Sequence, residues 1–236
     1  MKEKLNIEDI KQKIFDKLIP SGWGQKLKPF IFSGDFDNIL MHLHRLSIQN
    51  KKFTPTIKDL FRAFEECPYD KLKIVMVGQE PYLNVGSSDG LAFSCSNNPK
   101  IETSLKFILD EVNKTVYDGH AVSIDPDLKR WSNQGILLLN TSLTSQICTS
   151  GQHYEIWKPF MAYLFDLLNH NKNELIYLYI GKKAQKWVDS IDNGYKFLVT
   201  HPINPASLNT RRWNSDDVFL KTQLLVKEHY NTDIIW

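Results

Sequence analysis

Several protein classes are excluded by what this sequence has little of. Its 236 residues include three cysteines, Cys67, Cys95 and Cys148, which are too few and too widely spaced for a disulfide framework or a CxxC metal site. No apolar run approaches the roughly 18 residues of a membrane-spanning helix. The N-terminal residues have an amphipathic pattern, not that of a signal peptide. We therefore expect a protein without membrane attachment or export, with no metal and with buried thiols.

An excess of charge of one sign is also missing. The chain carries 29 Lys and Arg against 27 Asp and Glu, a formal net charge of +2. Hydrophobic residues make up 42% and charged residues 24%, as in ordinary globular proteins. Any nucleic-acid site must therefore depend on a local basic surface. Without repeats or long linkers, we predict one domain over 1–236, with a helical part over about 1–70 and an α/β core over 71–236.

Hydrophobic spacing predicts the elements of that domain. Apolar residues recur at helical spacing over 7–18, 36–43 and 57–64. Beyond residue 70, short apolar runs predict buried strands that alternate with helical patterns. The strands are expected at 72–77, 136–139, 175–180 and 196–199, and the helices at 104–116, 155–169, 182–190 and 216–229. This alternation predicts a single-domain α/β/α sandwich with a central four-stranded, mainly parallel sheet.

Chemically informative residues follow each predicted strand. Ligands bind at the carboxyl ends of the strands in parallel sheets, so these segments should meet at one edge. They contain a carboxylate, an amide, an imidazole and two aromatic rings, but no phosphate-binding glycine loop and no nucleophile beside an obvious base. Such a set suits recognition of a flat polar heterocycle. The segments are 78–82 with 90–94, 140–144, 181–183 and 201–207.

Four motifs in these segments resemble those of UNG-type uracil-DNA glycosylases. The family motifs GQDPYH, GLxFS, LLLNT and HPSPLS correspond to Gly78–Leu83, Gly90–Ser94, Leu137–Thr141 and His201–Ser207. The resemblance extends from about residue 22 to the C-terminal residue. It implies the family's α/β fold and a DNA-repair enzyme that needs no metal or other cofactor. Such an enzyme flips uracil out of single- or double-stranded DNA and hydrolyses its N-glycosidic bond, leaving an abasic site.

The resemblance assigns roles around the base. His201 would donate a hydrogen bond to uracil O2, and Asn140 would read the N3 and O4 edge. Phe93 would stack on the ring, while Tyr82 would occupy the space beside C5 and exclude the methyl group of thymine. Gln79 would contribute mainly through its backbone. The structural alternatives are an ordinary buried histidine, a turn-capping asparagine and two core aromatics.

Two positions of the first motif depart from the family. Glu80 stands where the family has Asp, the carboxylate that orients the attacking water and faces the sugar cation. The added methylene displaces the carboxylate by about an ångström, and a misplacement on that scale can cost on the order of 100-fold in rate. We predict a working carboxylate, the alternative being a weakened or retired site. Leu83 replaces the last His of the motif.

Further residues are expected to bind the DNA backbone. Pro81 belongs to the first motif, and Ser104 aligns with a phosphate-binding serine while also suiting the N-cap of the next helix. Gly181 and Lys182 correspond to the family's Gly-Ser loop, with a charged group in place of the serine hydroxyl.

The last motif carries one additional residue. Ser207 aligns with its second serine, and either Ala206 or Leu208 replaces the intercalating leucine, Leu208 being our choice. The adjoining Arg211-Arg212-Trp213 is a basic-aromatic cluster suited to backbone contact and stacking. The alternative is a solvated charge pair beside a core tryptophan.

A second functional class stays open at this stage. The altered loops are also compatible with a non-enzymatic DNA-binding or replication accessory protein, or with a reader of modified pyrimidines. A glycosylase with another base preference is a narrower alternative, which the bulk of Tyr82 disfavours. DNA is the expected partner, and a proteinaceous glycosylase inhibitor is a second candidate. We expect a cytoplasmic monomer from a bacterium or a virus-infected cell, with a nuclear location in a eukaryotic host as the alternative.

Overall fold

A computed structural model describes residues 6–98, 100–120, 125–172 and 174–236. Its centre is a four-stranded sheet in the order β3-β2-β5-β6 in which all neighbouring strands are parallel. The predicted α/β architecture is therefore confirmed. The strands are β2 (Ile74–Gly78), β3 (Ile136–Asn140), β5 (Ile176–Ile180) and β6 (Tyr195–Val199).

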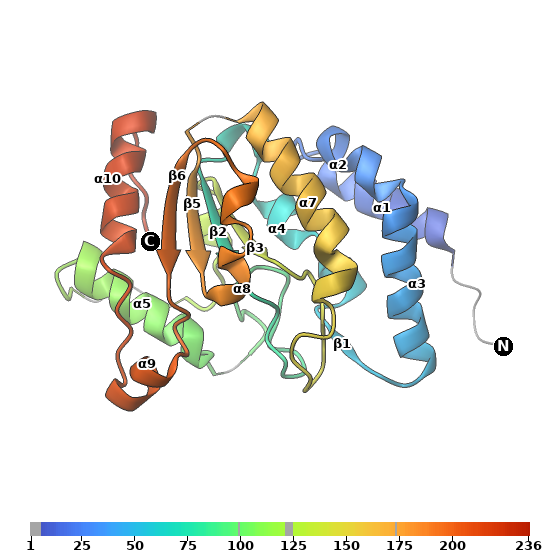
Figure 1. The fold of residues 1–236 in the computed structure, drawn as a ribbon, viewed down its shortest axis with the longest axis horizontal. Helices are drawn as coiled ribbons and strands as arrows, with labels where there is room; N and C mark the ends of the chain where they lie inside the picture. The colour runs from blue at the N-terminus through green and yellow to red at the C-terminus, as the bar shows by residue number, and fades with distance from the viewer. Residues whose placement is uncertain (1–5, 99, 121–124, 173) are drawn as a thin grey trace.

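Burial explains why three of these strands read as continuous apolar runs. Every residue of β2, β3 and β5 is buried, because helices cover both faces of the sheet. The edge strand β6 is more open, and its Leu198 is 56% exposed. Figure 1 shows all four strands running in one direction, so their carboxyl ends share one edge of the sheet.

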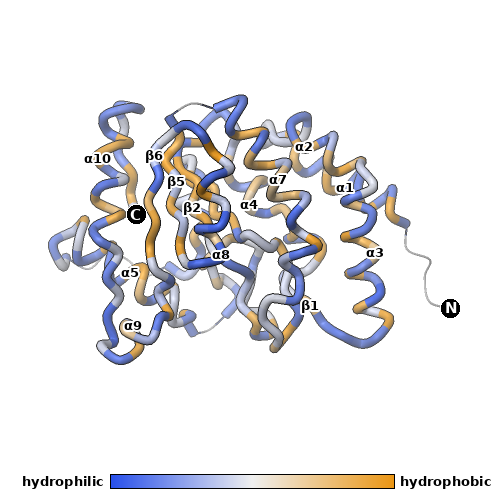
Figure 2. The backbone as a smooth tube through the Cα atoms, in the orientation of Figure 1, coloured by the Kyte–Doolittle hydropathy of each residue, from blue (hydrophilic) through white to orange (hydrophobic). Residues whose placement is uncertain are grey.

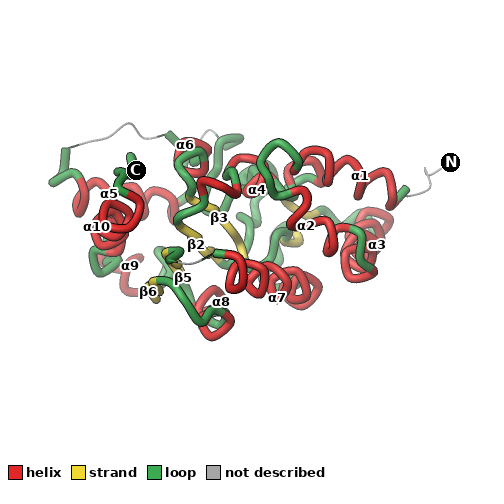
Figure 3. The backbone as a smooth tube through the Cα atoms, turned by 90° about the horizontal axis from the view of Figure 1, so that it is seen from above, coloured by secondary structure: helices red, strands yellow, loops and turns green. Residues whose placement is uncertain are grey.

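The long helices lie on opposite sides of the sheet. Figures 1 and 3 show α5 and α10 on one side, and α7 and α8 on the other. The N-terminal helices continue the layer of α7, with which α2 and α3 are in contact. The bounds are α5 (Thr103–Val116), α7 (Tyr154–Asn171), α8 (Lys182–Gln185) and α10 (Val218–Tyr230).

The N-terminal part is helical as predicted, although residues 1–5 lie outside the described residues. Sequence patterns did not predict α2, α6, α9 or the small antiparallel pair of β1 and β4, because all five are short. The bounds are α1 (Ile7–Leu18), α2 (Gly24–Ile31), α3 (Gly34–Ile48), β1 (Phe53–Thr54), α4 (Arg62–Glu66), α6 (Lys129–Ser132), β4 (Ser145–Gln146) and α9 (Pro205–Thr210).

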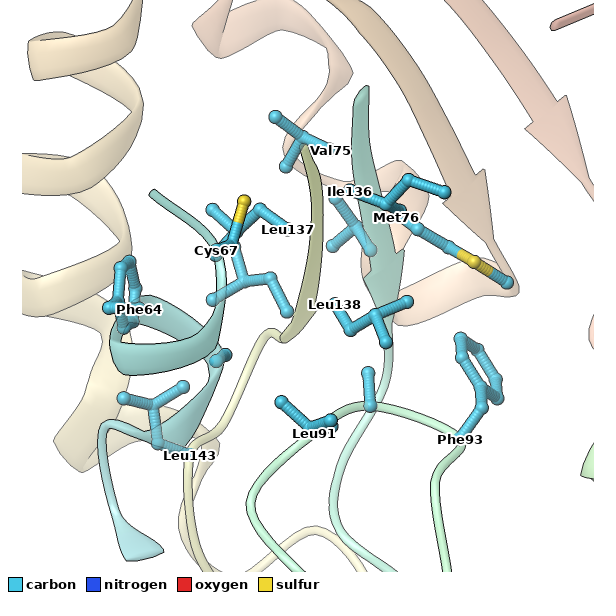
Figure 4. Close-up of a cluster of buried hydrophobic side chains, with 14 of the residues drawn as sticks. Phe64, Cys67, Val75, Met76, Leu91, Phe93, Ile136, Leu137, Leu138 and Leu143 are labelled. Atoms are coloured by element: carbon cyan, nitrogen blue, oxygen red, sulfur yellow. The ribbon is translucent and has the colours of Figure 1, made fainter. Parts of the chain in front are cut away.

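One hydrophobic cluster extends from the N-terminal helices to the sheet. Trp23, Phe61 and Phe160 are almost completely buried where the helical layer packs on itself. Figure 2 shows the apolar segments along the strands and the inner faces of the helices. Figure 4 shows Phe93 at the end of this cluster, beyond Met76. The prediction of a single domain stays a prediction, favoured by this continuity.

Three expectations are corrected. The helix predicted over 182–190 is interrupted, since α8 ends at Gln185 and a short 3-10 helix follows at Val188–Ser190. The pattern over 57–64 likewise forms a 3-10 helix, Ile57–Asp59, before α4. Cys148 is exposed, whereas the other two thiols are buried as expected. None of the helices in the described residues is long and apolar enough to cross a membrane.

The turn before β3 leads to a prediction about the free energy of unfolding. Gly135 has a φ of +95°, and a Cβ there would lie 1.9 Å from the Lys71 carbonyl oxygen. Its own carbonyl accepts hydrogen bonds from the amides of Lys73 and Ile74 at the start of β2. Gly135→Ala should lower the free energy of unfolding by about 2 kcal/mol or more, measured by urea denaturation.

Gly119→Ala is the matched control for this variant. Gly119 also has a positive φ, +81°, but among the described residues no atom beyond its chain neighbours lies within 4 Å of the position of its Cβ. In Gly119→Ala the free energy of unfolding should therefore decrease only through the strain of placing alanine at a positive φ. Equal losses in the two variants would show that the contact with Lys71 is unimportant.

Candidate active site

The carboxyl ends of the strands surround a hollow of about 300 Å³, here called the base pocket. It brings together the five residues that were predicted to bind or act on the base, together with Glu80. Its lining comprises Gln79, Glu80, Pro81, Tyr82, Leu83, Ser88, Leu91, Phe93, Ser104, Asn140, Ser150, Tyr154, Lys183, His201 and Ile203.

The register of β2 and β3 places the amide. Gly78 lies directly opposite Asn140, and a Cβ on Gly78 would be 2.6 Å from Asn140 Oδ1 and 3.0 Å from Phe93 Cζ. Only glycine therefore lets the amide and the ring approach each other. The two loops beyond the strands are joined because Thr141 Oγ1 donates a 2.7 Å hydrogen bond to the Gln79 carbonyl. Asn140 is 8% exposed, and no group in the described residues hydrogen-bonds to its side-chain amide.

Phe93 is held in an unusual backbone conformation. Its φ is +66°, a value that bulky L residues adopt only under constraint from their surroundings. The amide of the preceding Ala92 donates to the Leu138 carbonyl, which attaches this segment to β3. The ring is 6% exposed, and its centroid lies 6.4 Å from that of His201.

A buried carboxylate that the sequence did not single out organises the loop carrying Phe93. Asp89 accepts hydrogen bonds from the Leu91 amide, the Ser94 hydroxyl and both the amide and hydroxyl of Ser96. It also pairs with Arg62 at 3.0 Å. Because these partners come from a loop and from α4, no periodic sequence pattern marks them.

Tyr82 is oriented by its hydroxyl group. The Tyr82 hydroxyl donates to the Phe93 carbonyl at 2.8 Å and lies 2.9 Å from Ser104 Oγ. Burial raises the pKa of this phenol well above its usual value, so it stays neutral. Ser104 is buried, and the N-cap of α5 is Glu102, so the prediction of Ser104 as an N-cap is wrong. The hydroxyl of Ser104 instead contacts that of Tyr82 and supports its ring.

The hydrogen bonds of His201 indicate its tautomer. Nδ1 accepts from the Ile203 amide at 3.2 Å, which leaves the ring proton on Nε2. Burial lowers the pKa of His201, so the imidazole is neutral near pH 7. The Asn204 side chain donates to the His201 carbonyl at 2.8 Å and anchors the start of the loop.

Three donors hold the carboxylate of Glu80. Ser145 Oγ and the Gly151 amide donate to Oε2 at 2.9 and 3.0 Å, and Ser150 Oγ donates to Oε1. Ser145 lies in β4, and the other two lie in the loop that leads to α7. The sequence did not identify these serines, because serines in loops carry no distinctive pattern.

A buried histidine supports the same loop. Thr144 Oγ1 accepts from Trp157 Nε1 at 2.7 Å and lies 2.8 Å from His153 Nδ1. His153 is almost fully buried, and the ring of His42 meets it edge to face at 5.4 Å. Burial, with a smaller contribution from His42, lowers the pKa of His153 to about 4.

The residues predicted to bind DNA lie in different surroundings. Pro81 is buried in the wall of the base pocket. Gly181 has a φ of +88°, and a Cβ there would lie 2.9 Å from Gln79 Nε2 and 3.1 Å from His201 Cβ. Lys182 is exposed at the start of α8. Their contacts with DNA stay predictions.

The segment after His201 contains further residues predicted to bind DNA, and the contacts of Leu208, Arg211 and Arg212 with DNA stay predictions. Ser207 is buried and hydrogen-bonds to the N-cap residue of α9, whereas Leu208 is 50% exposed on that helix. Arg211 and Arg212 line a separate hollow with Asp110 and Glu111, away from the base pocket. Trp213 is 3% exposed and donates to the Thr200 carbonyl, so the predicted stacking on Trp213 is wrong.

Comparison with known families accounts for this arrangement. A family model described as the uracil DNA glycosylase superfamily matches residues 64–226, more than half of the chain. The chain belongs to this superfamily. The matched residues include every side chain named above around the base pocket.

Relatives of this superfamily member cover nearly all of its length. A uracil-DNA glycosylase 2 from Bacteroides fragilis is 31% identical over 220 residues, covering 92% of this chain and 98% of the relative. A uracil-DNA glycosylase from Acinetobacter baumannii is 29% identical, with 97% of both chains covered.

Solved structures also share the superfamily fold. A crystal structure of mimivirus uracil-DNA glycosylase has a TM-score of 0.81 at 25% identity, covering 92% of this chain and 86% of the other. The UNG structure from Nitratifractor salsuginis has a TM-score of 0.64 at 17% identity, covering 95% and 98%, and supports the fold alone. In the described residues of this superfamily member, no group of three or more His, Cys, Asp or Glu side chains could hold a metal ion.

The lowered pKa of His153 leads to a prediction about how the free energy of unfolding depends on pH. Its pKa is about 4 in the folded protein and near 6.5 in the unfolded chain. Between these values the unfolded chain binds a proton that the folded protein does not, so the free energy of unfolding should decrease as the pH falls from about 6.5 to about 4. Urea denaturation across this range measures the effect, and His153→Asn should reduce this dependence. An identical pH profile in the variant would contradict the assignment.

Proposed function

We propose that this protein excises uracil from DNA by hydrolysing the N-glycosidic bond. The observation that carries the proposal is the convergence of an amide, an aromatic ring and a neutral imidazole on one pocket, with a carboxylate in its wall. This combination suits a flat pyrimidine and the two charges that develop when it leaves. The membership of this protein in the uracil DNA glycosylase superfamily supports the same reaction.

The pocket discriminates uracil by shape and by its polar edge. The ring of Phe93 offers a surface for stacking, and the Asn140 amide can accept from N3–H while donating to O4. Cytosine presents the opposite polarity at position 4 and leaves these groups mismatched. Tyr82, whose ring is held in place by its hydroxyl contacts, occupies the space beside C5 and excludes the methyl of thymine.

His201 stabilises the departing base. As the bond between C1′ and N1 breaks, negative charge develops on the uracil oxygens. The Nε2–H of the neutral imidazole donates to O2, because Nδ1 is occupied by the Ile203 amide. Because the imidazole is already neutral and fixed in place, it stabilises the uracil anion by a hydrogen bond without any prior change of its own protonation state.

Glu80 acts on the sugar side of the reaction. Its carboxylate orients a water molecule and faces the positive charge that develops on the deoxyribose. The water oxygen bonds to C1′, one water proton passes to the carboxylate, and the bond to N1 breaks. Its three donors hold the longer side chain of Glu in one place, which offsets the added methylene relative to the family's Asp.

The UNG-type subclass is part of the proposal, supported by the four motifs. Leu83 departs from that subclass and places an apolar side chain in the pocket wall. We propose a monomer that acts on single- or double-stranded DNA. An inhibitor is a further proposed partner, because a solved mimivirus UNG variant is in complex with UGI.

The role of Glu80 can be tested by excision assays. Glu80→Gln should slow release of uracil from a single-stranded oligonucleotide by about 100-fold or more, through loss of the charge. Glu80→Asp should also be slower than wild type, because the shorter side chain cannot reach all three donors. Ser150→Ala removes one charge-assisted hydrogen bond and should slow the reaction about tenfold. Abasic sites are measured by alkali cleavage.

Thr149→Ala is the matched control for Ser150→Ala, because Thr149 is the adjacent hydroxyl and bonds Gln146 and Ile147, not Glu80. It should excise uracil at nearly the wild-type rate. If the wild-type protein releases no uracil, the proposal that it is a uracil-excising enzyme is refuted. Faster excision by Glu80→Asp than by the wild type would show instead that Glu80 positions the water less well than the Asp of the family.

The steric gate gives a separate prediction. Tyr82→Ala should acquire measurable release of thymine, because the space beside C5 is vacated. Tyr82→Phe keeps the ring and loses only the hydroxyl contacts to Phe93 and Ser104, so it should still reject thymine. Chromatography of released bases distinguishes these outcomes, and continued rejection of thymine by Tyr82→Ala would contradict the gate.

A further inference from the structure

A second hollow, here called the lysine groove, adjoins the base pocket. It has a volume of about 350 Å³ and lies between the start of α7 and the region of α8. It shares Tyr154 and Lys183 with the base pocket, and its Thr141 directly follows Asn140. The lining comprises Thr141, Tyr154, Glu155, Lys158, Lys183, Lys186, Trp187 and Ser190.

Helical spacing brings three lysines to this groove. Lys183 and Lys186 are three residues apart on the segment that begins with α8, and Lys158 lies one turn after Tyr154 on α7. With Glu155 as the single acidic residue of the lining, three lysines and one glutamate give a formal charge of +2. The groove therefore has the same formal charge as the whole chain.

These lysines have no acidic partner among the described residues, whereas several other lysines do. Lys11, Lys13 and Lys227 each pair with a carboxylate within 3.1 Å. In contrast, no carboxylate in the described residues lies within ion-pair distance of Lys158, Lys183 or Lys186. Lys183 Nζ instead lies 4.5 Å from the centre of the Tyr154 ring. Unneutralised ammonium groups around one groove are suited to a polyanion.

We propose that the lysine groove binds the backbone phosphates of the DNA strand on one side of the flipped uridine. This inference rests on the proposed function, since the flipped base in the pocket determines which part of the strand reaches the groove. The shared Tyr154 and Lys183 make the path continuous. Burial and the nearby Glu80 carboxylate raise the pKa of Tyr154, so its hydroxyl stays neutral and does not repel a phosphate.

The two arginines that were predicted to bind DNA lie at a different hollow. Arg211 and Arg212 line another hollow, with Asp110, Glu111 and Lys114, and this hollow shares no residue with the base pocket. Of these two basic hollows, the lysine groove is the one that shares residues with the base pocket. It binds phosphates regardless of sequence, because ammonium groups recognise charge and not base edges.

Direct binding tests the groove without depending on catalysis. Lys158→Gln/Lys186→Gln leaves Lys183, which the base pocket shares, unchanged. Fluorescence anisotropy with labelled oligothymidylate at low salt should show binding weakened about tenfold. The slope of log K against log salt should become shallower by about 1.4, or roughly 0.7 for each lost phosphate contact. Circular dichroism and thermal melting check that the variant is folded.

Lys13→Gln/Lys227→Gln is the matched control, because it removes the same charge from exposed positions on α1 and α10. It should bind within twofold of wild type with an unchanged salt slope. If the groove variant and the control bind alike, the proposal is overturned.

Excision kinetics then locate the contact on the strand. Oligonucleotides are extended stepwise on the 5′ or the 3′ side of a single uracil. Extension on one side should lower KM for the wild type, and the groove variant should lose that gain while keeping kcat within twofold. An equal KM gain in both proteins would overturn the proposal. If wild-type protein releases no uracil, the proposed function fails separately, and the anisotropy result still decides whether the groove binds DNA.

Discussion

The parallel pairing of β2 with β3 is the constraint on which the rest of the site depends. Their register places Gly78 opposite Asn140, and the absence of a side chain at Gly78 lets the amide meet the ring of Phe93. The Gln79 carbonyl is then bonded by Thr141, so the two loops behave as one unit. Asp89 fixes the conformation of the third loop, which the Ala92 amide attaches to β3. A rigid base pocket follows because each of its walls is bonded to a buried strand or to another wall.

Hydrogen bonds and burial position the two polar groups proposed to act in the reaction. His201 is neutral because burial disfavours its charged form, and the Ile203 amide selects its tautomer. Glu80 has three donors on its carboxylate. In the proposed reaction, the imidazole donates to the base and the carboxylate faces the sugar, on two sides of the bond that breaks. The lysine groove proposed to bind phosphates adjoins this pocket through Lys183, which lines both hollows, whereas Lys158 and Lys186 line the groove alone.

Much of the fold could be predicted because strands buried on both faces have continuous apolar sequences. β2, β3 and β5 were found in this way, as were the long helices with one apolar face. Short elements escaped, since α6, α9 and β4 span too few residues to show a period. Ser104 was misjudged as an N-cap because a serine near a helix start carries the same local signal whether it caps or supports Tyr82. Trp213 was misplaced because a basic neighbourhood in sequence does not reveal that its ring is buried.

The sequence alone determined the fold class and which residues follow each strand, because apolar periodicity and the four motifs are local properties of the chain. It thereby identified Asn140, Phe93 and His201 as neighbours in one pocket. Only the tertiary structure decided what holds these groups and where the positive charge gathers. The donors to Glu80 lie 65 to 71 residues away from it in the chain. Lys158 of α7 and Lys186, directly after α8, line one groove. Contacts of that kind arise from packing, which no local pattern encodes.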